Sequence, residues 1–225
     1  MPPDPAQSSR HWPRHGWVRL GKGWTSRLRS PLAEAERAEV ADWCAAGRPL
    51  VIARGRPEDG AGELRLGLAT PDKRRIGLHV AADAVAARLD PLPLAEAVKT
   101  APEAWRPMLA ELVRRAQDVG VMPAVYGSLA WQHRTGLAYV RPESDIDLLF
   151  APRERWQLDR LLDLLAAVGD GSPRLDGEIL LPDGAAVAWR ELAGRPGRLL
   201  VKGPAEVDLR DLPTVLALFD RENAA

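Results

Sequence analysis

The second half of the chain alternates between two patterns of apolar residues. Apolar side chains recur at the three- and four-residue spacing of a helix face in segments 109–116 and 158–165. Short runs rich in Val, Ile, Leu and Ala lie between and after these segments and predict strands. The predicted strands are "VMPAVYG", "ESDIDLLF", two strands within "RLDGEILLPDGAAVAWREL", and "RLLVKG", and a helix is predicted over 211–221. This alternation favours an α/β sandwich, a mixed sheet with flanking helices.

The first part of the chain has a different pattern. The runs "RPLVIARG", "ELRLGLATP" and "RRIGLHV" are rich in apolar residues, are separated by Gly, Pro and Asp, and predict three strands. A helix is predicted between Ser30-Pro31 and Gly47, because Pro suits the first helical turn and Gly suits its end. We therefore expect a small, strand-rich α+β module over residues 1–80, with the first ten or so residues disordered, and a second domain over residues 81–225.

The composition narrows the functional classes. The 31 basic and 31 acidic residues give a formal net charge of zero, which argues against general electrostatic binding of nucleic acid. A single cysteine, Cys44, can form neither an intramolecular disulfide nor a cysteine-rich zinc site. No apolar run approaches the ~20 residues that cross a bilayer, and "MPPDPAQSSR" does not resemble a signal peptide. We therefore expect a cytoplasmic protein that binds neither nucleic acid nor membrane.

Two aspartates stand at alternating positions of the predicted strand "ESDIDLLF". Side chains at i and i+2 of a strand share one face, so Asp145 and Asp147 lie together while Ile146 and Leu148 face the other side. Neighbouring carboxylates repel each other unless water or a cation lies between them. Mg²⁺ prefers oxygen ligands and often binds one or two carboxylates together with substrate phosphates. The pair therefore indicates a metal site for Mg²⁺ or Mn²⁺.

A Gly-Ser pair precedes these aspartates, at the end of the predicted strand "VMPAVYG". Gly127 lets the backbone turn tightly and approach a ligand, and Ser128 is placed to cap the helix "SLAWQHRT" that follows. The amides and the dipole at a helix N-terminus favour a phosphate, to which a serine hydroxyl can also donate. We therefore predict that Gly127 and Ser128 bind phosphate beside the metal.

The combination of "YGSLAWQ" and "ESDIDLLF" resembles the nucleotidyltransferase superfamily of the DNA polymerase β type. That pattern is Gly-Ser, a short helix, an Asp-x-Asp strand and a third carboxylate on a later strand. The segment "LDGEI" offers Asp176 and Glu178 as the third metal-binding acid, which could act as the base towards the acceptor. Asp176 is favoured slightly, although Gly177 between the two acids departs from the superfamily pattern. The candidates for binding the outer phosphates are Arg190, Lys202 and Arg134.

A closer resemblance covers roughly residues 40–210. The segments "YGSLAWQ", "TGLAYVRPESDIDLL", "RLDGEI", "GAAVAWREL" and "LLVKG" look like the malonate decarboxylase holo-acyl-carrier-protein synthase family, also called phosphoribosyl-dephospho-CoA transferases. The N-terminal "RPLVIARG" and "LRLGLATPDKRRIGLHV" are similar to the leading module of that family. The resemblance implies a polymerase β-like domain that follows this module. It also implies that Asp145 and Asp147 are the catalytic, metal-binding pair and that Gly127 and Ser128 hold a triphosphate.

The same resemblance implies a reaction and its partners. Members are expected to attach the 2'-(5''-phosphoribosyl)-3'-dephospho-CoA group, from its triphosphate precursor, to a serine of the acyl-carrier subunit of malonate decarboxylase. A phosphodiester forms and pyrophosphate leaves. Two alternatives stay open: another small-molecule nucleotidyltransferase of the superfamily, and a non-catalytic binding relative. An inactive relative is expected to have lost a carboxylate, whereas Asp145 and Asp147 are both present.

Overall fold

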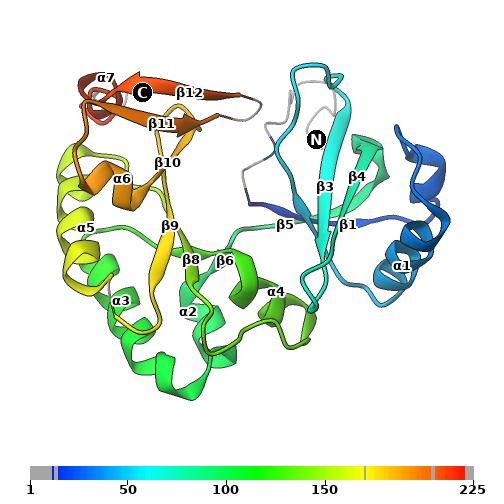
Figure 1. Cartoon of the computed structure of the whole chain (residues 1–225), viewed down its shortest axis with the longest axis horizontal. Coiled ribbons are helices and arrows are strands. Elements are labelled where there is room, and N and C mark those ends of the chain that lie inside the picture. The colour runs from blue at the N-terminus through cyan, green and yellow to red at the C-terminus, as the bar shows by residue number, and fades with distance from the viewer. Residues whose placement is uncertain (1–11, 13–14, 170, 204–205, 221–225) are drawn as a thin grey trace, which may run out of the picture. The chain divides into compact units, whose positions relative to one another are not determined.

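The computed structural model describes residues 12, 15–169, 171–203 and 206–220 (Figure 1). The predicted disorder at the start of the chain lies outside these residues. The chain divides into two compact units, Met1–Asp90 and Pro91–Ala225. Each unit contains one sheet with associated helices, so the predicted mixture of helices and strands is confirmed. No helix in these described ranges is both long and apolar enough to span a bilayer.

The first unit is built on a five-stranded antiparallel sheet in the order β4-β3-β2-β1-β5. Its elements are β1 (Trp17–Leu20), η1 (Trp24–Arg27), α1 (Glu34–Ala45), β2 (Leu50–Ile52), β3 (Glu63–Ala69), β4 (Arg75–Ala81), η2 (Ala82–Ala84) and β5 (Val85–Leu89). The three predicted strands correspond to β2, β3 and β4. The expected module ended at residue 80, whereas β5 extends this unit because it pairs with β1.

The core of the first unit follows the two-residue period of its longest hairpin. Leu64, Leu66 and Leu68 of β3 are buried, and their register partners Val80, Leu78 and Ile76 on β4 are buried beside them. The helix α1 adds Val40 and Trp43, and the Trp43 Nε1 donates to the Pro49 carbonyl at 2.9 Å. Cross-strand pairs of branched residues are what makes such a ladder stable.

The second unit is built on a seven-stranded sheet in the order β12-β11-β10-β9-β8-β7-β6. Its strands are β6 (Leu92–Pro93), β7 (Ala124–Val125), β8 (Ile146–Phe150), β9 (Leu175–Leu180), β10 (Ala186–Ala188), β11 (Arg198–Lys202) and β12 (Val207–Asp211). Its helices are α2 (Leu94–Ala97), η3 (Val98–Thr100), η4 (Glu103–Trp105), α3 (Arg106–Asp118), α4 (Gly127–Thr135), α5 (Arg155–Val168), α6 (Trp189–Ala193) and α7 (Leu212–Leu216). Among the described strands, β8 and β9 pair in parallel and the other neighbours are antiparallel.

The parallel pair depends on α5, which runs between the end of β8 and the start of β9. A parallel connection needs a long crossover, whereas antiparallel neighbours can be joined by a short turn. The helices α3, α5 and α6 lie along one side of the sheet (Figure 1). The predicted helix faces are confirmed, because their apolar residues are buried: Leu109, Leu112, Val113, Ala116, Leu158, Leu161, Leu162 and Leu165.

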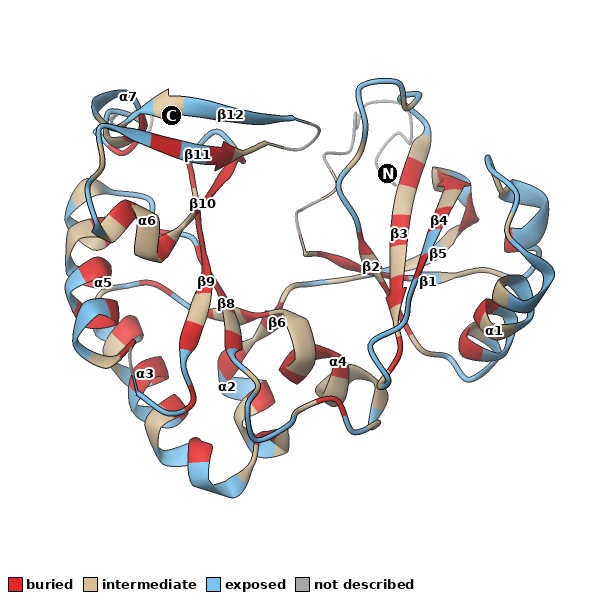
Figure 2. Ribbon diagram, in the orientation of Figure 1, coloured by how far each residue is buried: buried red, intermediate tan, exposed pale blue. Residues whose placement is uncertain are grey.

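The sheet in the second unit has one buried and one more open face. On β11, Leu199 and Val201 are fully buried, whereas the alternating Arg198 and Leu200 are exposed (Figure 2). The strand β12 was not predicted, and the helix predicted over 211–221 is α7, which begins at Leu212 with a proline in its first turn. Both faces of β12 are solvent-accessible, so the apolar periodicity that predicts a half-buried strand is missing there.

Candidate active site

Asp147 and Asp176 lie side by side on the parallel strands β8 and β9, where they are register partners. Partners in a ladder point to the same side of the sheet, so the two carboxylates share a face. Asp145 precedes β8 and is exposed, and Glu178 follows Asp176 by two residues on the same face of β9. We name these four residues the carboxylate cluster. The structure therefore brings together the acids that the sequence predicted, from segments about thirty residues apart.

The neighbours that shift the pKa of Asp147, at the centre of the carboxylate cluster, are all negatively charged. The pKa of Asp147 is raised from 3.8 to about 6, first by burial and then by the charges of Asp176, Asp145 and Glu178. Burial and like charges both disfavour the ionised form of a carboxylic acid. A hard divalent cation near Asp147 would reverse both effects, since it supplies the missing opposite charge.

Gly127 lies against the Asp147 carboxylate. It begins α4 with a positive φ of 62°, and a Cβ added to it would lie 1.8 Å from Asp147 Oδ2. The preceding Tyr126 amide donates to the Asp147 carbonyl at 3.0 Å, which fixes the start of α4 to β8. Glycine is required here both by the backbone conformation and by the close approach. The N-terminus of α4 and the carboxylate cluster are therefore neighbours.

Ser128 lies in the first turn of α4. The N-cap of this helix is Tyr126, and no side chain makes a capping hydrogen bond there. The predicted capping role of Ser128 is therefore wrong, because the helix begins one residue earlier than the sequence pattern indicated. Its predicted role in phosphate binding stays a prediction.

The two candidates for the third acid differ in their partners. Glu178 is 4% exposed, and its Oε1 accepts a hydrogen bond from the Lys202 Nζ at 2.9 Å. Lys202 reaches it across β10, where the small Ala186 is the register partner of Lys202 on one side and of Leu180 on the other. A buried carboxylate held by a lysine is already charge-compensated. Lys202 is therefore bound to Glu178, and its predicted phosphate contact stays a prediction.

Asp176 has a more open environment. It is half-buried, and its Oδ1 accepts a hydrogen bond from the Gly177 amide at 2.8 Å. Gly177 has a φ of 141°, and a Cβ there would lie 2.0 Å from the Leu148 carbonyl oxygen. The glycine that interrupts the superfamily pattern is thus explained by the close approach of β8. Asp176 is the register partner of Asp147, and among the described residues the lysine contact is made by Glu178 instead. Both observations favour Asp176 over Glu178 as the third acid.

Arg190 makes contacts within its own unit. Its Nη2 donates to the carbonyls of Gly169 at 2.6 Å and Leu175 at 3.1 Å, and its guanidinium lies 4.4 Å from the centre of the Trp189 ring. These bonds tie α6 to the segment that enters β9. The predicted phosphate-binding role of Arg190 stays a prediction, as does that of Arg134, which is half-buried in the last turn of α4.

Gln132 positions α4 and was not predicted. Its Nε2 donates to the Thr100 carbonyl at 2.7 Å, and its Oε1 accepts from the amides of Tyr139 at 3.2 Å and Val140 at 3.1 Å. Trp131 stacks on Tyr139 with ring centres 5.8 Å apart. No local sequence pattern could predict the contact with Thr100, because Thr100 lies far from Gln132 along the chain.

A second group of ionisable residues lies in the first unit, on β3, on β4 and in the turn before β3. Ligand-type atoms of Asp59, Glu63 and His79 lie within 4.8 Å of one another, a spacing that can accommodate a metal ion. The His79 Nε2 is 3.2 Å from Glu63 and 3.6 Å from Asp59. Arg65 donates to both Asp59 oxygens, at 2.7 to 3.0 Å. We name these four residues the N-terminal ion cluster, which the sequence did not predict.

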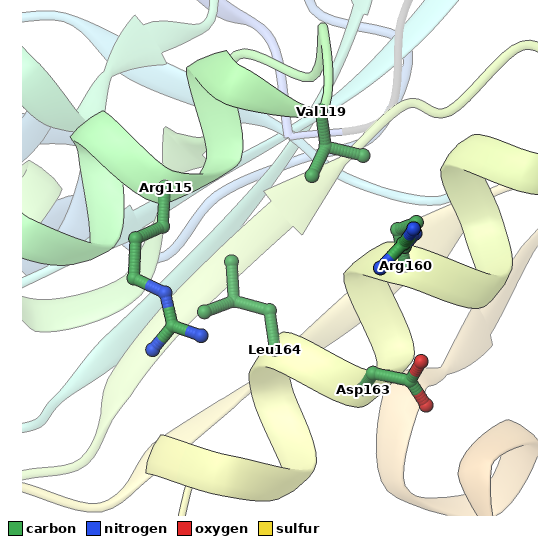
Figure 3. A pocket seen from close by; sticks show the side chains of 5 residues that line it. All are labelled: Arg115, Val119, Arg160, Asp163 and Leu164. Carbon is green, nitrogen blue, oxygen red and sulfur yellow. The ribbon is translucent and has the colours of Figure 1, made fainter.

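A hollow of about 200 Å³ lies between α3 and α5 (Figure 3). Its lining residues are Arg115, Val119, Arg160, Asp163 and Leu164. None of the predicted site residues lines it. Its lining includes one acid, Asp163, so it does not repeat the group of acids found on β8 and β9.

Comparisons with known proteins cover both units. Residues 93–213 match the family model described as "Phosphoribosyl-dephospho-CoA transferase MdcG C-terminal domain", and residues 13–91 match the corresponding N-terminal domain model. A protein of Xanthomonas euvesicatoria named phosphoribosyl-dephospho-CoA transferase is 37% identical over 213 residues, which cover 93% of this chain and 96% of the relative. A protein of the same name from Bradyrhizobium diazoefficiens is 40% identical over 193 residues, covering 84% and 85%. No solved structure matches.

Proposed function

The chain belongs to the phosphoribosyl-dephospho-CoA transferase family, and we propose that it attaches the 2'-(5''-phosphoribosyl)-3'-dephospho-CoA group to a carrier protein. The donor is the triphosphate precursor, and the acceptor is a serine of the acyl-carrier subunit of malonate decarboxylase. The acceptor oxygen bonds to the phosphorus nearest the ribose, the bond from that phosphorus to the next phosphate breaks, and pyrophosphate leaves. The observation that carries this proposal is the parallel register of Asp147 and Asp176 beside the start of α4.

The arrangement supports placing the second unit in the polymerase β-type nucleotidyltransferase superfamily. A glycine at the start of a helix lies against the second aspartate of an Asp-x-Asp strand, and a neighbouring strand supplies a third acid. This is the spatial counterpart of the pattern seen in the sequence. Phosphoryl transfer depends mainly on positioning and charge neutralisation, which a rigid sheet with a helix N-terminus can supply.

The residues present fit a Mg²⁺ or Mn²⁺ ion. Asp145, Asp147 and Asp176 provide carboxylate oxygens, the ligands that hard cations prefer, and the raised pKa of Asp147 marks a site that lacks positive charge. When bound, such an ion neutralises the charge that develops on the phosphates during transfer. Glu178 is the weaker ligand candidate because Lys202 already holds it.

The residues around the carboxylate cluster are proposed to bind the phosphate and to accept the proton of the acceptor. Gly127 brings the first amides of α4 close to Asp147, and a phosphate placed there would face the helix N-terminus. The Ser128 hydroxyl is placed one residue further on to donate to the same phosphate. Asp176 is the proposed base that accepts the proton of the acceptor serine, since it is less buried than Glu178 and adjoins Asp147.

We also propose a cytoplasmic location. The single cysteine is consistent with a reducing compartment, since it supplies no disulfide framework.

The direct test is to incubate the purified protein with the triphosphate donor, Mg²⁺ and the apo acyl-carrier subunit, and to weigh the carrier by mass spectrometry. We expect a mass gain equal to the phosphoribosyl-dephospho-CoA group and one pyrophosphate released per modified carrier. Reactions without donor or with excess EDTA are the controls and should show no gain. An unmodified carrier under the complete conditions would refute the proposed function, and a carrier whose acceptor serine is replaced by alanine should stay unmodified.

A further inference from the structure

Three large apolar side chains are exposed together at one end of the second sheet. Leu200 on β11 is 42% exposed, and Val207 and Leu209 on β12 are 43% and 54% exposed. Leu200 is the register partner of Leu209, and Val207 is the partner of Lys202, so all three point to the same face. We name this group the apolar shelf. Contiguous exposed apolar side chains are typical of surfaces that bind another molecule.

The apolar shelf and the carboxylate cluster are on the same face of the sheet. Lys202, two residues from Leu200, lies opposite Ala186, which lies opposite Leu180, and Leu180 shares its face with Glu178. The Lys202–Glu178 hydrogen bond spans this face directly. Strands are spaced by about 4.8 Å, so β11 and β12 are about 14 Å and 19 Å sideways from β8. The shelf is therefore a continuation of the candidate active site.

Two cations next to the shelf, on the same face, are paired within the chain. Lys202 holds Glu178, and Arg198 lies 3.5 Å from Asp211. The cations at its rim are therefore already neutralised, which leaves the shelf poorly suited to phosphate groups. Its available contact is apolar burial, worth about 25 cal/mol per Å² removed from water.

We propose that the apolar shelf is the docking surface for the protein that presents the acceptor serine. This inference rests on the proposed function, because it takes the acceptor to be a protein. A folded domain of about 100 residues has a radius of gyration of about 13 Å. When such a body places a hydroxyl at Asp147 and Asp176, it also covers neighbouring strands that lie about 14 to 19 Å sideways from β8. The shelf lies within that area, whereas a flexible small molecule need not cross it.

The test replaces the apolar surface and leaves the carboxylates intact. The double variant Leu200→Ser/Leu209→Ser is compared with wild type and with Met122→Ser, a matched control that alters another exposed apolar residue. Steady-state transfer is measured while the apo carrier and the triphosphate donor are varied separately. Calorimetric titration with the apo carrier, without donor, measures docking independently of turnover. Circular dichroism and sedimentation check the fold and the oligomeric state.

We expect the KM for the carrier and its dissociation constant to rise at least about tenfold in the double variant, the size of effect that hot-spot residues produce. The kcat and the KM for the donor should stay within about twofold of wild type, as should every value for Met122→Ser. If the double variant binds the carrier as tightly as wild type, the docking inference is overturned, whereas transfer by wild type still upholds the proposed function. A rise in the donor KM alone would assign the shelf to the nucleotide and would overturn the docking inference. A change in oligomeric state would assign the shelf to a second copy of the chain and would also overturn the docking inference. Wild type that neither binds nor modifies the carrier would refute both proposals.

Discussion

The carboxylate cluster and the N-terminal ion cluster differ in how the charge of their acids is compensated. In the N-terminal ion cluster, Asp59 is bonded to Arg65 and to the Arg56 amide, and its pKa is lowered, chiefly by the Arg65 hydrogen bonds. In the carboxylate cluster, the pKa of Asp147 is raised to about 6, chiefly by burial. The pKa of an aspartate is therefore shifted in opposite directions in the two clusters.

This difference decides which cluster needs a cation. Proximity of ligand atoms favours the N-terminal ion cluster, because among the described residues it is the group whose atoms meet within 4.8 Å. Charge favours the carboxylate cluster, because Arg65 already neutralises Asp59, and a metal at Asp59 would have to displace or tolerate it. We give charge the greater weight, since a side-chain rotation that brings ligand atoms together is easier than breaking the half-buried, doubly hydrogen-bonded Asp59–Arg65 pair.

The largest expected effect is on transfer, where the two clusters can be compared directly. Asp147→Asn should lower kcat by more than about a hundredfold, since removing even an outer partner of a metal ligand costs about 10- to 100-fold. Asp59→Asn should leave kcat within about twofold, because Arg65 already neutralises Asp59 and the proposed site does not include it. The measurement is the initial rate of mass gain on the carrier. Equal losses in both variants would remove the functional distinction between the clusters.

An intermediate effect is expected from the glycine that adjoins Asp147. Gly127 and Gly136, at the two ends of α4, have φ angles of 62° and 72°. An added Cβ would clash with Asp147 at Gly127 but meets nothing within 4 Å at Gly136. Gly136→Ala should therefore lower the free energy of unfolding by about 1 kcal/mol through backbone strain alone, and Gly127→Ala by about 3 kcal/mol.

Urea unfolding measures both glycine variants, and the transfer assay should show a loss for Gly127→Ala only. If the two variants lost the same stability and the same activity, the contact between α4 and Asp147 would have no importance for the site.

The third expected effect is a pH dependence of stability with opposite signs in the two clusters. The pKa of Asp147 is higher in the folded state, about 6 against 3.8, so its ionisation destabilises the fold. This cost is absent below about pH 4, grows up to about pH 6 and is complete above it. Without divalent ions, Asp147→Asn should be more stable than wild type by about 2 kcal/mol at pH 8 and equally stable at pH 4.

Asp59 has a lowered pKa, so its contribution to stability is present above the ordinary carboxyl range and is lost as the pH falls. Asp59→Asn should accordingly be less stable than wild type at pH 8, with a difference that shrinks on acidification. Urea unfolding in EDTA at the two pH values measures both variants. A shift of the same sign in both would contradict the comparison.

Local patterns predicted much of the second unit. The apolar faces of α3 and α5 are buried as predicted, since helix periodicity is a property of residues three and four apart. The strand that carries Asp147 and the glycine that begins α4 were also found, because alternation and Gly-Ser are short-range signals. The strand β12 was missed because exposure on both faces removes the alternation that would identify it.

The sequence by itself determined which side chains are available for chemistry: two alternating aspartates, a Gly-Ser pair and two further acids. Only the tertiary structure decided how they differ. The crossover through α5 places Asp176 beside Asp147, and Lys202 compensates the charge of Glu178. In the first unit, Arg65 forms an ion pair with Asp59. The reason is physical: side-chain direction follows from neighbouring residues, whereas burial and charge compensation depend on contacts between distant segments.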